Sequence, residues 1–202
     1  MIGAMAAAAI IAGGRGTRMG GLVKGRLVVG GHCIVERQLE ALRAVFDSLI
    51  IVANDPEPWR DTGVAVVGDR WPDAGPLAGI EAALAHFAAA GAKTVVCVAG
   101  DMPWLRPALL RLLRDAPPEA AAVVPRAGGQ PQPLLARYAV RLQPIIAARL
   151  AGGRRAVHRL FDEVDVTWLD EAALRTVDPA LDSLRDVNTP ADLDRARAPD
   201  AR

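Results

Sequence analysis

A glycine-rich segment that carries two arginines follows the first apolar run of the chain, and a lysine lies shortly after it. The apolar run covers residues 6–12, the segment GGRGTRMGG covers residues 13–21, and Lys24 lies ten residues beyond Gly14. Glycines let backbone N–H groups approach an anion without side-chain obstruction, and arginine or lysine adds positive charge. The pattern predicts a phosphate-binding loop, with a plain surface loop and a solvated lysine as the alternatives.

Two commoner phosphate loops fit this segment poorly. A dinucleotide fingerprint needs G-x-G-x-x-G opening directly into a helix, but Gly14, Gly16 and Gly20 contain one residue too many, and residues 26–29 are predicted to be a strand. A P-loop needs Ser or Thr after Gly-Lys, whereas Gly25 follows Lys24. The loop therefore belongs to neither of these classes.

An acidic turn is the second chemical signal. Asp101 lies in the sequence GDMP, directly after the strongly apolar run 94–99. A carboxylate held at the end of a buried strand can bind Mg²⁺, which in proteins takes one or two carboxylates together with substrate phosphates. The alternative is an aspartate that only forms the turn.

Short apolar runs alternate with helical patterns and predict an α/β fold in which helices cover both faces of a mostly parallel sheet. Buried strands are expected at residues 6–12, 49–53, 64–67 and 94–99. The residues that follow these strands include Gly13, Asn54, Asp69 and Asp101. Ligands bind beyond the carboxyl ends of parallel strands, so these residues should converge on one edge.

Apolar stripes at helical spacing predict helices over residues 35–46 and 77–87, and a third helix is expected at 107–115. Further along, strands are expected at 121–124 and 134–137, a helix at 140–150, and a final helix from the capping Thr189 to residue 197. We interpret residues 1–202 as a single domain with halves 6–115 and 116–197.

Composition excludes several classes of protein. The 202 residues carry 24 basic and 23 acidic side chains, and this balance argues against nucleic acid as the main partner. Two distant cysteines suit neither a disulfide framework nor a zinc site, and they indicate a reducing cytoplasm. The sequence lacks the uninterrupted apolar run of about 18 residues that a membrane span requires.

Five motifs occur in an order that resembles the molybdenum cofactor guanylyltransferases. They are AGG at 12–14, RMG at 18–20, GPLAG at 75–79, DMP at 101–103 and VNTP at 187–190. The resemblance covers about residues 6–197 and implies a Rossmann-like nucleotidyltransferase fold. It also implies that Mg²⁺ is the cofactor and that the substrates are GTP and Mo-molybdopterin, which yield molybdopterin guanine dinucleotide and pyrophosphate. Transient contact with molybdenum cofactor proteins or a recipient molybdoenzyme is a further expectation.

The resemblance also assigns roles to individual residues. Lys24, Asp101 and Arg18 are the candidate catalytic residues, Asp101 is the metal ligand, and Asp69 would hold guanine by accepting from N1–H and the 2-amino group. The candidate GTP contacts are Ile11, Ala12, Gly13, Gly14, Lys24, Asn54, Asp69, Gly75, Gly79 and Asp101. The candidate molybdopterin contacts are Gln132, Arg154, Arg155 and Asn188. A solvated loop acid is the alternative for Asp69, and a solvent-exposed basic helix start is the alternative for both arginines.

The sequence departs from the family pattern at two positions. Val23 precedes the loop lysine where the family often has an acid, and Asp186 stands where an asparagine is common. The family's asparagine after the second strand aligns with either Val52 or Asn54. Two other functions remain open: a relative that transfers another nucleotide, using CTP or a sugar phosphate, and a nucleotide-binding module without catalysis.

Overall fold

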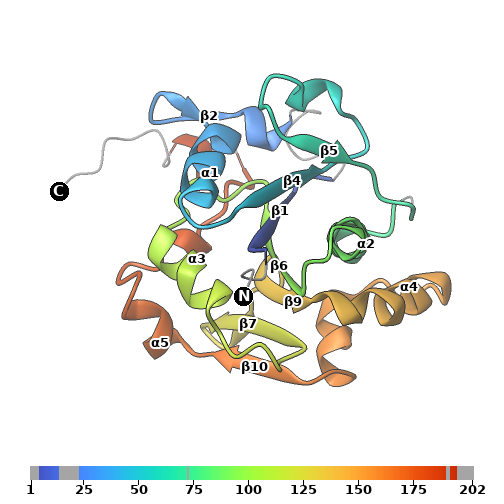
Figure 1. The fold of residues 1–202 in the computed structure, drawn as a ribbon. Coiled ribbons are helices and arrows are strands. Elements are labelled where there is room, and N and C mark those ends of the chain that lie inside the picture. The colour runs from blue at the N-terminus through green and yellow to red at the C-terminus, as the bar shows by residue number, and fades with distance from the viewer. Residues whose placement is uncertain (1–4, 14–22, 72, 190–191, 195–202) are drawn as a thin grey trace.

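The computed structural model describes residues 5–13, 23–71, 73–189 and 192–194. Within them an eight-stranded sheet forms the centre of the molecule, with its main path in the order β10-β7-β9-β6-β1-β4-β5 and β8 paired with β7 (Figure 1). The strands are β1 (Ala7–Ile11), β4 (Ser48–Val52), β5 (Ala65–Val67), β6 (Thr94–Ala99), β7 (Ala122–Ala127), β8 (Gln130–Pro131), β9 (Leu135–Ala139) and β10 (Val166–Leu169). A separate short hairpin pairs β2 (Val28–Val29) with β3 (His32–Cys33).

The sheet is mostly parallel, as predicted. β1 pairs in parallel with both β4 and β6, β4 pairs with β5, and β7 pairs with β10. Along the main path β9 alone runs in the opposite direction, between β6 and β7. The strands of the second half of the chain therefore continue the sheet of the first half.

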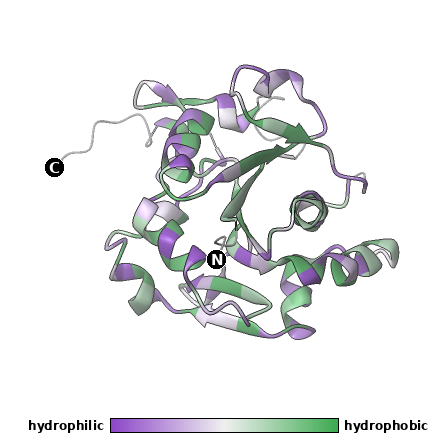
Figure 2. Cartoon of the chain, in the orientation of Figure 1, coloured by the Kyte–Doolittle hydropathy of each residue, from purple (hydrophilic) through white to green (hydrophobic). Residues whose placement is uncertain are grey.

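Helices cover both faces of the sheet (Figure 1). They are α1 (Ile34–Arg43), α2 (Pro76–Ala89), α3 (Pro107–Arg114), α4 (Gln143–Ala151) and α5 (Glu171–Arg175). In β1, Ala7, Ala9 and Ile11 pack in the core that contains α2 and α4, while Ala8 and Ile10 pack in the core that contains α1 and α3. The central strands are apolar on both faces for this reason, and their residues are mostly coloured green in Figure 2.

Most of the longer strands and helices lie where the sequence predicts them, with several differences. Residues 24–26 form a 3-10 turn instead of the start of a strand, because Arg26 and Leu27 donate backbone hydrogen bonds to Val23 and Lys24. The predicted helix 140–150 begins as a 3-10 turn (Val140–Leu142), and α4 starts at Gln143. Pro144 has no N–H for the carbonyl of Val140, so the α-helix starts later. The sequence predicts neither the short strands β3 and β8, nor strand β10, nor helix α5, and helix α1 ends at Arg43, before the predicted residue 46.

The predicted cap of the last helix is present. The hydroxyl of Thr189 accepts from the backbone N–H of Asp192, while the Asp192 carboxylate accepts from the backbone N–H of Thr189. Residues 192–194 are helical, and the remainder of the predicted helix lies outside the described residues. In the part of the chain that the structure describes, every helix is too short or too polar to cross a membrane.

Candidate active site

The carboxyl ends of four strands meet at one edge, as predicted. The N–H of Ala12 donates to the carbonyl of Val52 at 2.9 Å, and the N–H of Gly100 donates to the carbonyl of Ile11 at 3.0 Å. The N–H of Ala53 donates to the carbonyl of Val67 at 3.0 Å. These bonds continue the β1, β4, β5 and β6 ladders into the loops that carry the polar candidates.

Lys24 and Asp101 form an ion pair at this edge. The Lys24 Nζ lies 2.8 Å from Asp101 Oδ2 and also donates to the side-chain oxygen of Asn188. The two charged side chains are 26% and 19% exposed, so both remain accessible to a ligand. Three segments that are far apart in the sequence thus bring a cation, a carboxylate and an amide together.

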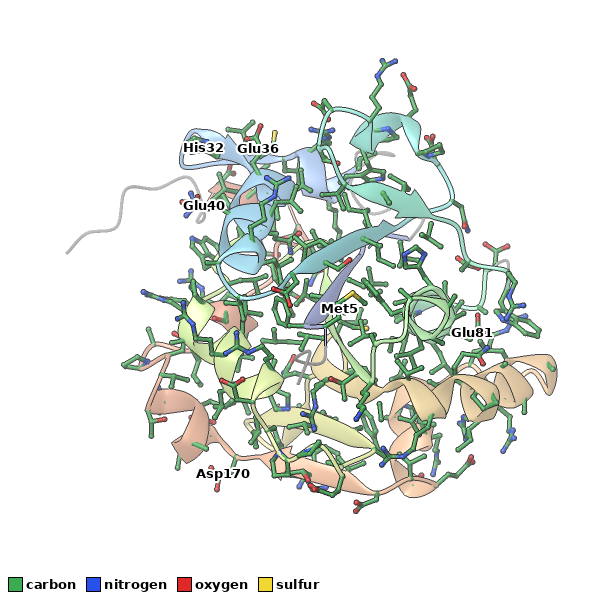
Figure 3. The ribbon with its side chains drawn as sticks, viewed as in Figure 1. Met5, His32, Glu36, Glu40, Glu81 and Asp170 are labelled. Carbon is green, nitrogen blue, oxygen red and sulfur yellow. The ribbon has the colours of Figure 1, made fainter. Side chains whose placement is uncertain are left out.

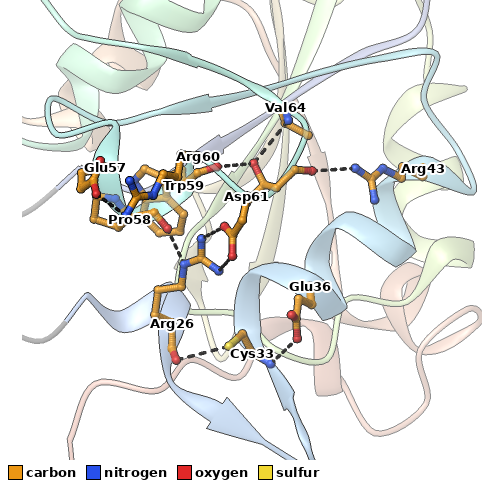
Figure 4. Close-up of polar contacts among 11 residues, drawn as sticks. Arg26, Cys33, Glu36, Arg43, Glu57, Pro58, Trp59, Arg60, Asp61 and Val64 are labelled. Atoms are coloured by element: carbon orange, nitrogen blue, oxygen red, sulfur yellow. Dashed lines mark hydrogen bonds and ion pairs between the residues drawn. The ribbon is translucent and has the colours of Figure 1, made fainter.

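The position of Lys24 is set by the loop that follows β4. A Cβ atom on Gly25 would lie 2.7 Å from the Trp59 ring, so only glycine allows this approach. Arg26 lies over the same ring and bonds to the carbonyl of Pro58 and the carboxylate of Asp61 (Figure 4). The hydrogen bond from Arg26 lowers the pKa of Asp61. These contacts hold the turn that presents Lys24.

Asn188 is fixed from several directions. The backbone N–H of Val187 donates to the Asp101 carbonyl at 2.9 Å, and Val187 is fully buried against Leu27 and Ile34. The Asn188 amide donates to Asp186 Oδ2 at 2.6 Å. A lysine can only donate and a carboxylate can only accept, so the two neighbours define which way the amide faces. The departure from the family pattern at Asp186 thus orients Asn188.

Asn54 and Asp69 form a reciprocal pair beside β4 and β5. The Asn54 amide donates to Asp69 Oδ2 and accepts from the backbone N–H of Asp69, both at 2.9 Å. The N–H of Trp71 donates to Asp69 Oδ1 at 2.9 Å. Val52, the other candidate for the family asparagine, is buried in β4. Each Asp69 oxygen has a second lone pair available for a ligand.

Ile11 and Gly79 pack together in the core. Both are buried, and a Cβ atom on Gly79 would lie 2.6 Å from Ile11 Cγ2. Gly79 lets α2 approach β1 closely. Packing therefore explains the last glycine of the GPLAG motif. Gly75 precedes α2 with φ 74°, a conformation that favours glycine. The nucleotide contacts assigned to these three residues stay predictions.

Because β9 is antiparallel to β6, the segment before β9 brings Gln132, a predicted molybdopterin contact, toward this edge. The N–H of Ala99 donates to the carbonyl of Leu134 at 2.8 Å, so the segment before β9 lies beside the end of β6. Arg155 donates to the Asp73 carbonyl at 3.2 Å, which places it near the start of α2. Arg154 is paired with Glu163 at 3.2 Å. Gly14 and Arg18 lie outside the described residues.

The site suits a divalent cation that takes most of its ligands from substrate. Asp101 offers one partly exposed carboxylate, and Asn188 places an amide oxygen close to it. Elsewhere among the described residues, groups of three or more His, Cys, Asp or Glu side chains arranged for a metal do not occur. One carboxylate is enough for Mg²⁺ when phosphates and water complete its shell.

Residues 8–167, which include all of β1 but Ala7, the segment after β1, Lys24, Asp69 and Asp101, match the family model described as the MobA-like NTP transferase domain. The chain belongs to this family. It is 30% identical to the molybdenum cofactor guanylyltransferase of Desulfosudis oleivorans over 190 residues, which cover 94% of this chain and 93% of the relative. It is 35% identical to the Cereibacter sphaeroides protein of the same name over 190 residues, 94% of each chain.

Solved structures of this family have the same fold. The crystal structure of molybdopterin-guanine dinucleotide biosynthesis protein A from Archaeoglobus fulgidus superposes with a TM-score of 0.80 and 28% identity. The match covers 94% of this chain and 96% of that chain. The fold is therefore the Rossmann-like fold of nucleotidyltransferases, and it extends over nearly the whole chain.

Proposed function

We propose that this protein transfers GMP from GTP to Mo-molybdopterin, forming molybdopterin guanine dinucleotide and pyrophosphate. The observation that carries the proposal is the ion pair between Lys24 and Asp101, with Asn188 beside it, at the strand edge where the glycine-rich loop begins. We call these three residues the phosphate end of the site. The names of the relatives point to the same reaction.

The phosphate end supplies charge neutralisation. The attacking group is a phosphate oxygen of molybdopterin, which is already anionic at neutral pH, so no side chain has to remove a proton from it. Lys24 can follow the negative charge that moves onto the leaving pyrophosphate, and Asp101 would hold Mg²⁺. When bound, Mg²⁺ neutralises charge on the phosphates. Arg18 would add a further cation from the loop.

Asn54, Asp69 and Arg70 form what we call the base end of the site. Guanine presents N1–H and the 2-amino group side by side, and both can donate to the Asp69 carboxylate. Cytosine presents one amino group next to acceptor atoms, which a carboxylate repels. Because Asn54 and the Trp71 N–H hold this carboxylate in place, the base end favours GTP over CTP.

The second substrate would lie on the side of β9 and α4. Gln132 and Asn188 are polar groups near the end of β6, and Arg155 lies beside the loop before α2. Arg154 would have to leave Glu163 to reach a substrate phosphate. The structure contains Cys33 and Cys97 as free thiols, in keeping with a reducing cytoplasm, where we place the reaction.

The deciding experiment measures pyrophosphate release from purified protein with Mg²⁺, nucleotide and molybdopterin added separately and together. Release is expected only with GTP and molybdopterin combined, and CTP should replace GTP poorly. Equal release with CTP would overturn the assignment of guanine. Tight GTP binding without pyrophosphate release under any combination would make the protein a binding module instead of an enzyme.

A further inference from the structure

A carboxylate is buried in the otherwise apolar helix α2. Glu81 is 0% exposed and lies on the side of α2 that faces α4 (Figure 3). Its Oε1 accepts from Arg70 Nη2 at 2.6 Å and from Gln143 Nε2 at 2.6 Å. Its Oε2 has no hydrogen-bond partner among the described residues. Burying a charged group with half of its acceptors unused costs stability, so packing alone does not account for a glutamate here.

The partner of Glu81 is the residue that follows Asp69. The Arg70 side chain is 66% exposed, so burial does not fix its position. The bond to Glu81 ties Arg70 to α2, while Asn54 ties Asp69 to the end of β4. Trp71 packs partly into the core around α2. The loop that carries Asp69 is therefore held from the sheet on one side and from α2 on the other.

We propose that Glu81 is a positioning residue for guanine recognition. It acts through Arg70, which it holds so that the neighbouring Asp69 presents its carboxylate at a fixed place and angle. Glu81 itself never touches the nucleotide. This inference rests on the proposed role of Asp69 as the guanine ligand, and it adds a residue that lies outside every motif of the sequence.

A purely structural role and a positioning role predict different behaviour for Glu81→Met. Methionine has a similar volume and would fill the same apolar space, and the freed Arg70 can be solvated because it is mostly exposed. Removing one partner of an ion pair is strongly destabilising when the other charge stays buried, and the exposed Arg70 avoids this cost. The variant should therefore keep or raise its melting temperature while the loop before α2 loses an anchor.

The test compares GTP with ITP, whose base lacks the 2-amino group. Titration calorimetry with Mg²⁺ should give wild-type protein a preference for GTP of about tenfold or more, the scale of one hydrogen bond to a charged acceptor. Asp69→Asn should abolish most of this preference. Glu81→Met should reduce it to about threefold or less, because Asp69 is then less well placed. The double variant with Arg70→Ala should be no worse than Glu81→Met alone, since both changes break one pair.

Glu171→Gln is the matched control, because it weakens a Glu–Arg pair within α5. It should leave both affinities unchanged. If Asp69→Asn loses the preference while Glu81→Met keeps it, the positioning role is wrong and the guanine site stands. If wild-type protein binds GTP and ITP equally, the assignment of Asp69 fails, and the inference fails with it. A fall in melting temperature without any change in preference would make Glu81 merely structural.

Discussion

The phosphate end joins segments that lie far apart in the sequence, whereas the base end is built from the loops after two neighbouring strands. Lys24 reaches Asp101 across 77 positions and Asn188 across 164 positions. Asn54 and Asp69 are 15 positions apart, on loops that follow the paired strands β4 and β5. Behind the base end lies the buried Glu81, while the ion pair of the phosphate end is partly exposed.

This difference indicates that the two ends of the site have different functions. At the phosphate end the groups bond to one another, so Lys24 must exchange Asp101 for a ligand phosphate when nucleotide binds. At the base end the contacts to Asp69 leave lone pairs for guanine, so it can receive the base without breaking existing bonds. We expect changes at the phosphate end to affect mainly turnover, and changes at the base end to affect mainly nucleotide binding and selectivity.

Asp101→Ala should have the largest effect. Removing the carboxylate that would hold Mg²⁺ should lower kcat for pyrophosphate release by a factor of about 10³ or more, because the leaving phosphates lose their main charge neutralisation. The fold should persist, since no helix or strand depends on this partly exposed side chain. Circular dichroism and turnover with Mg-GTP check both points. Turnover near the wild-type value would exclude the metal assignment.

Lys24→Ala should have the second largest effect on turnover. Losing one preorganised cation costs roughly 2 to 4 kcal/mol of transition-state stabilisation, which corresponds to about 30- to 1000-fold in kcat. Lys93, the other lysine of the chain, is exposed and provides a matched control as Lys93→Ala. Steady-state kinetics should show the loss for Lys24 alone. Equal rates for the two variants would mean that Lys24 is only a solvated side chain.

Asn54→Ala should have a smaller effect of a different kind. The variant removes two hydrogen bonds that hold Asp69, each worth about 1 kcal/mol, so the KM for GTP should rise roughly five- to thirtyfold. kcat should change little, because the phosphate end is intact. A fall in kcat with an unchanged KM would contradict the proposed division of work between the two ends.

The sequence placed residues of both ends at one edge, but it assigned Asn188 to the molybdopterin side and did not predict its contact with Lys24. Lys24, Asp101 and Asn188 each lie in a recognisable turn, and parallel strands deliver such turns to one edge. The contact of Asn54 with Asp69 also follows from adjacent strands. The bond between Arg70 and Glu81 depends on how α2 packs on the sheet, which local pattern does not specify. The one indication of this bond in the sequence is Glu81, a single acidic residue within the predicted apolar helix 77–87.

The sequence pattern also does not predict the direction of β9 or the presence of the edge strand β10. The apolar residues of β9 show that it is buried, but the same residues serve a strand of either direction, so its antiparallel orientation was not predicted. Strand β10 lies at the edge of the sheet and its four residues are only partly buried. An edge strand lacks the continuous apolar run that marked β1 and β6.

The smallest effect should come from a change at Asp182, whose turn supports the phosphate end. Arg106 donates to Asp182 at 2.7 Å, and this bond, together with Arg185, lowers the pKa of Asp182 below its ordinary value. Asp182 begins the 3-10 turn Asp182–Leu184, shortly before Asn188. A carboxylate whose pKa is lower in the folded state stabilises the fold above its unfolded pKa, about 3.9, and this stabilisation is lost as pH falls through the folded value.

Urea unfolding of Asp182→Asn and wild-type protein between pH 3 and pH 7 tests this support. At pH 7 the variant should be less stable by about 1 kcal/mol or less, since the half-exposed Arg106 is screened by solvent. The difference in the free energy of unfolding should narrow below about pH 4, because the Asp182 carboxylate takes up a proton in the unfolded chain at a higher pH than in the folded protein. If the difference in the free energy of unfolding stays constant down to pH 3, neutral hydrogen bonds hold this turn. In that case this turn would be held as Asn54 holds Asp69 at the base end, by hydrogen bonds that need no ion pair.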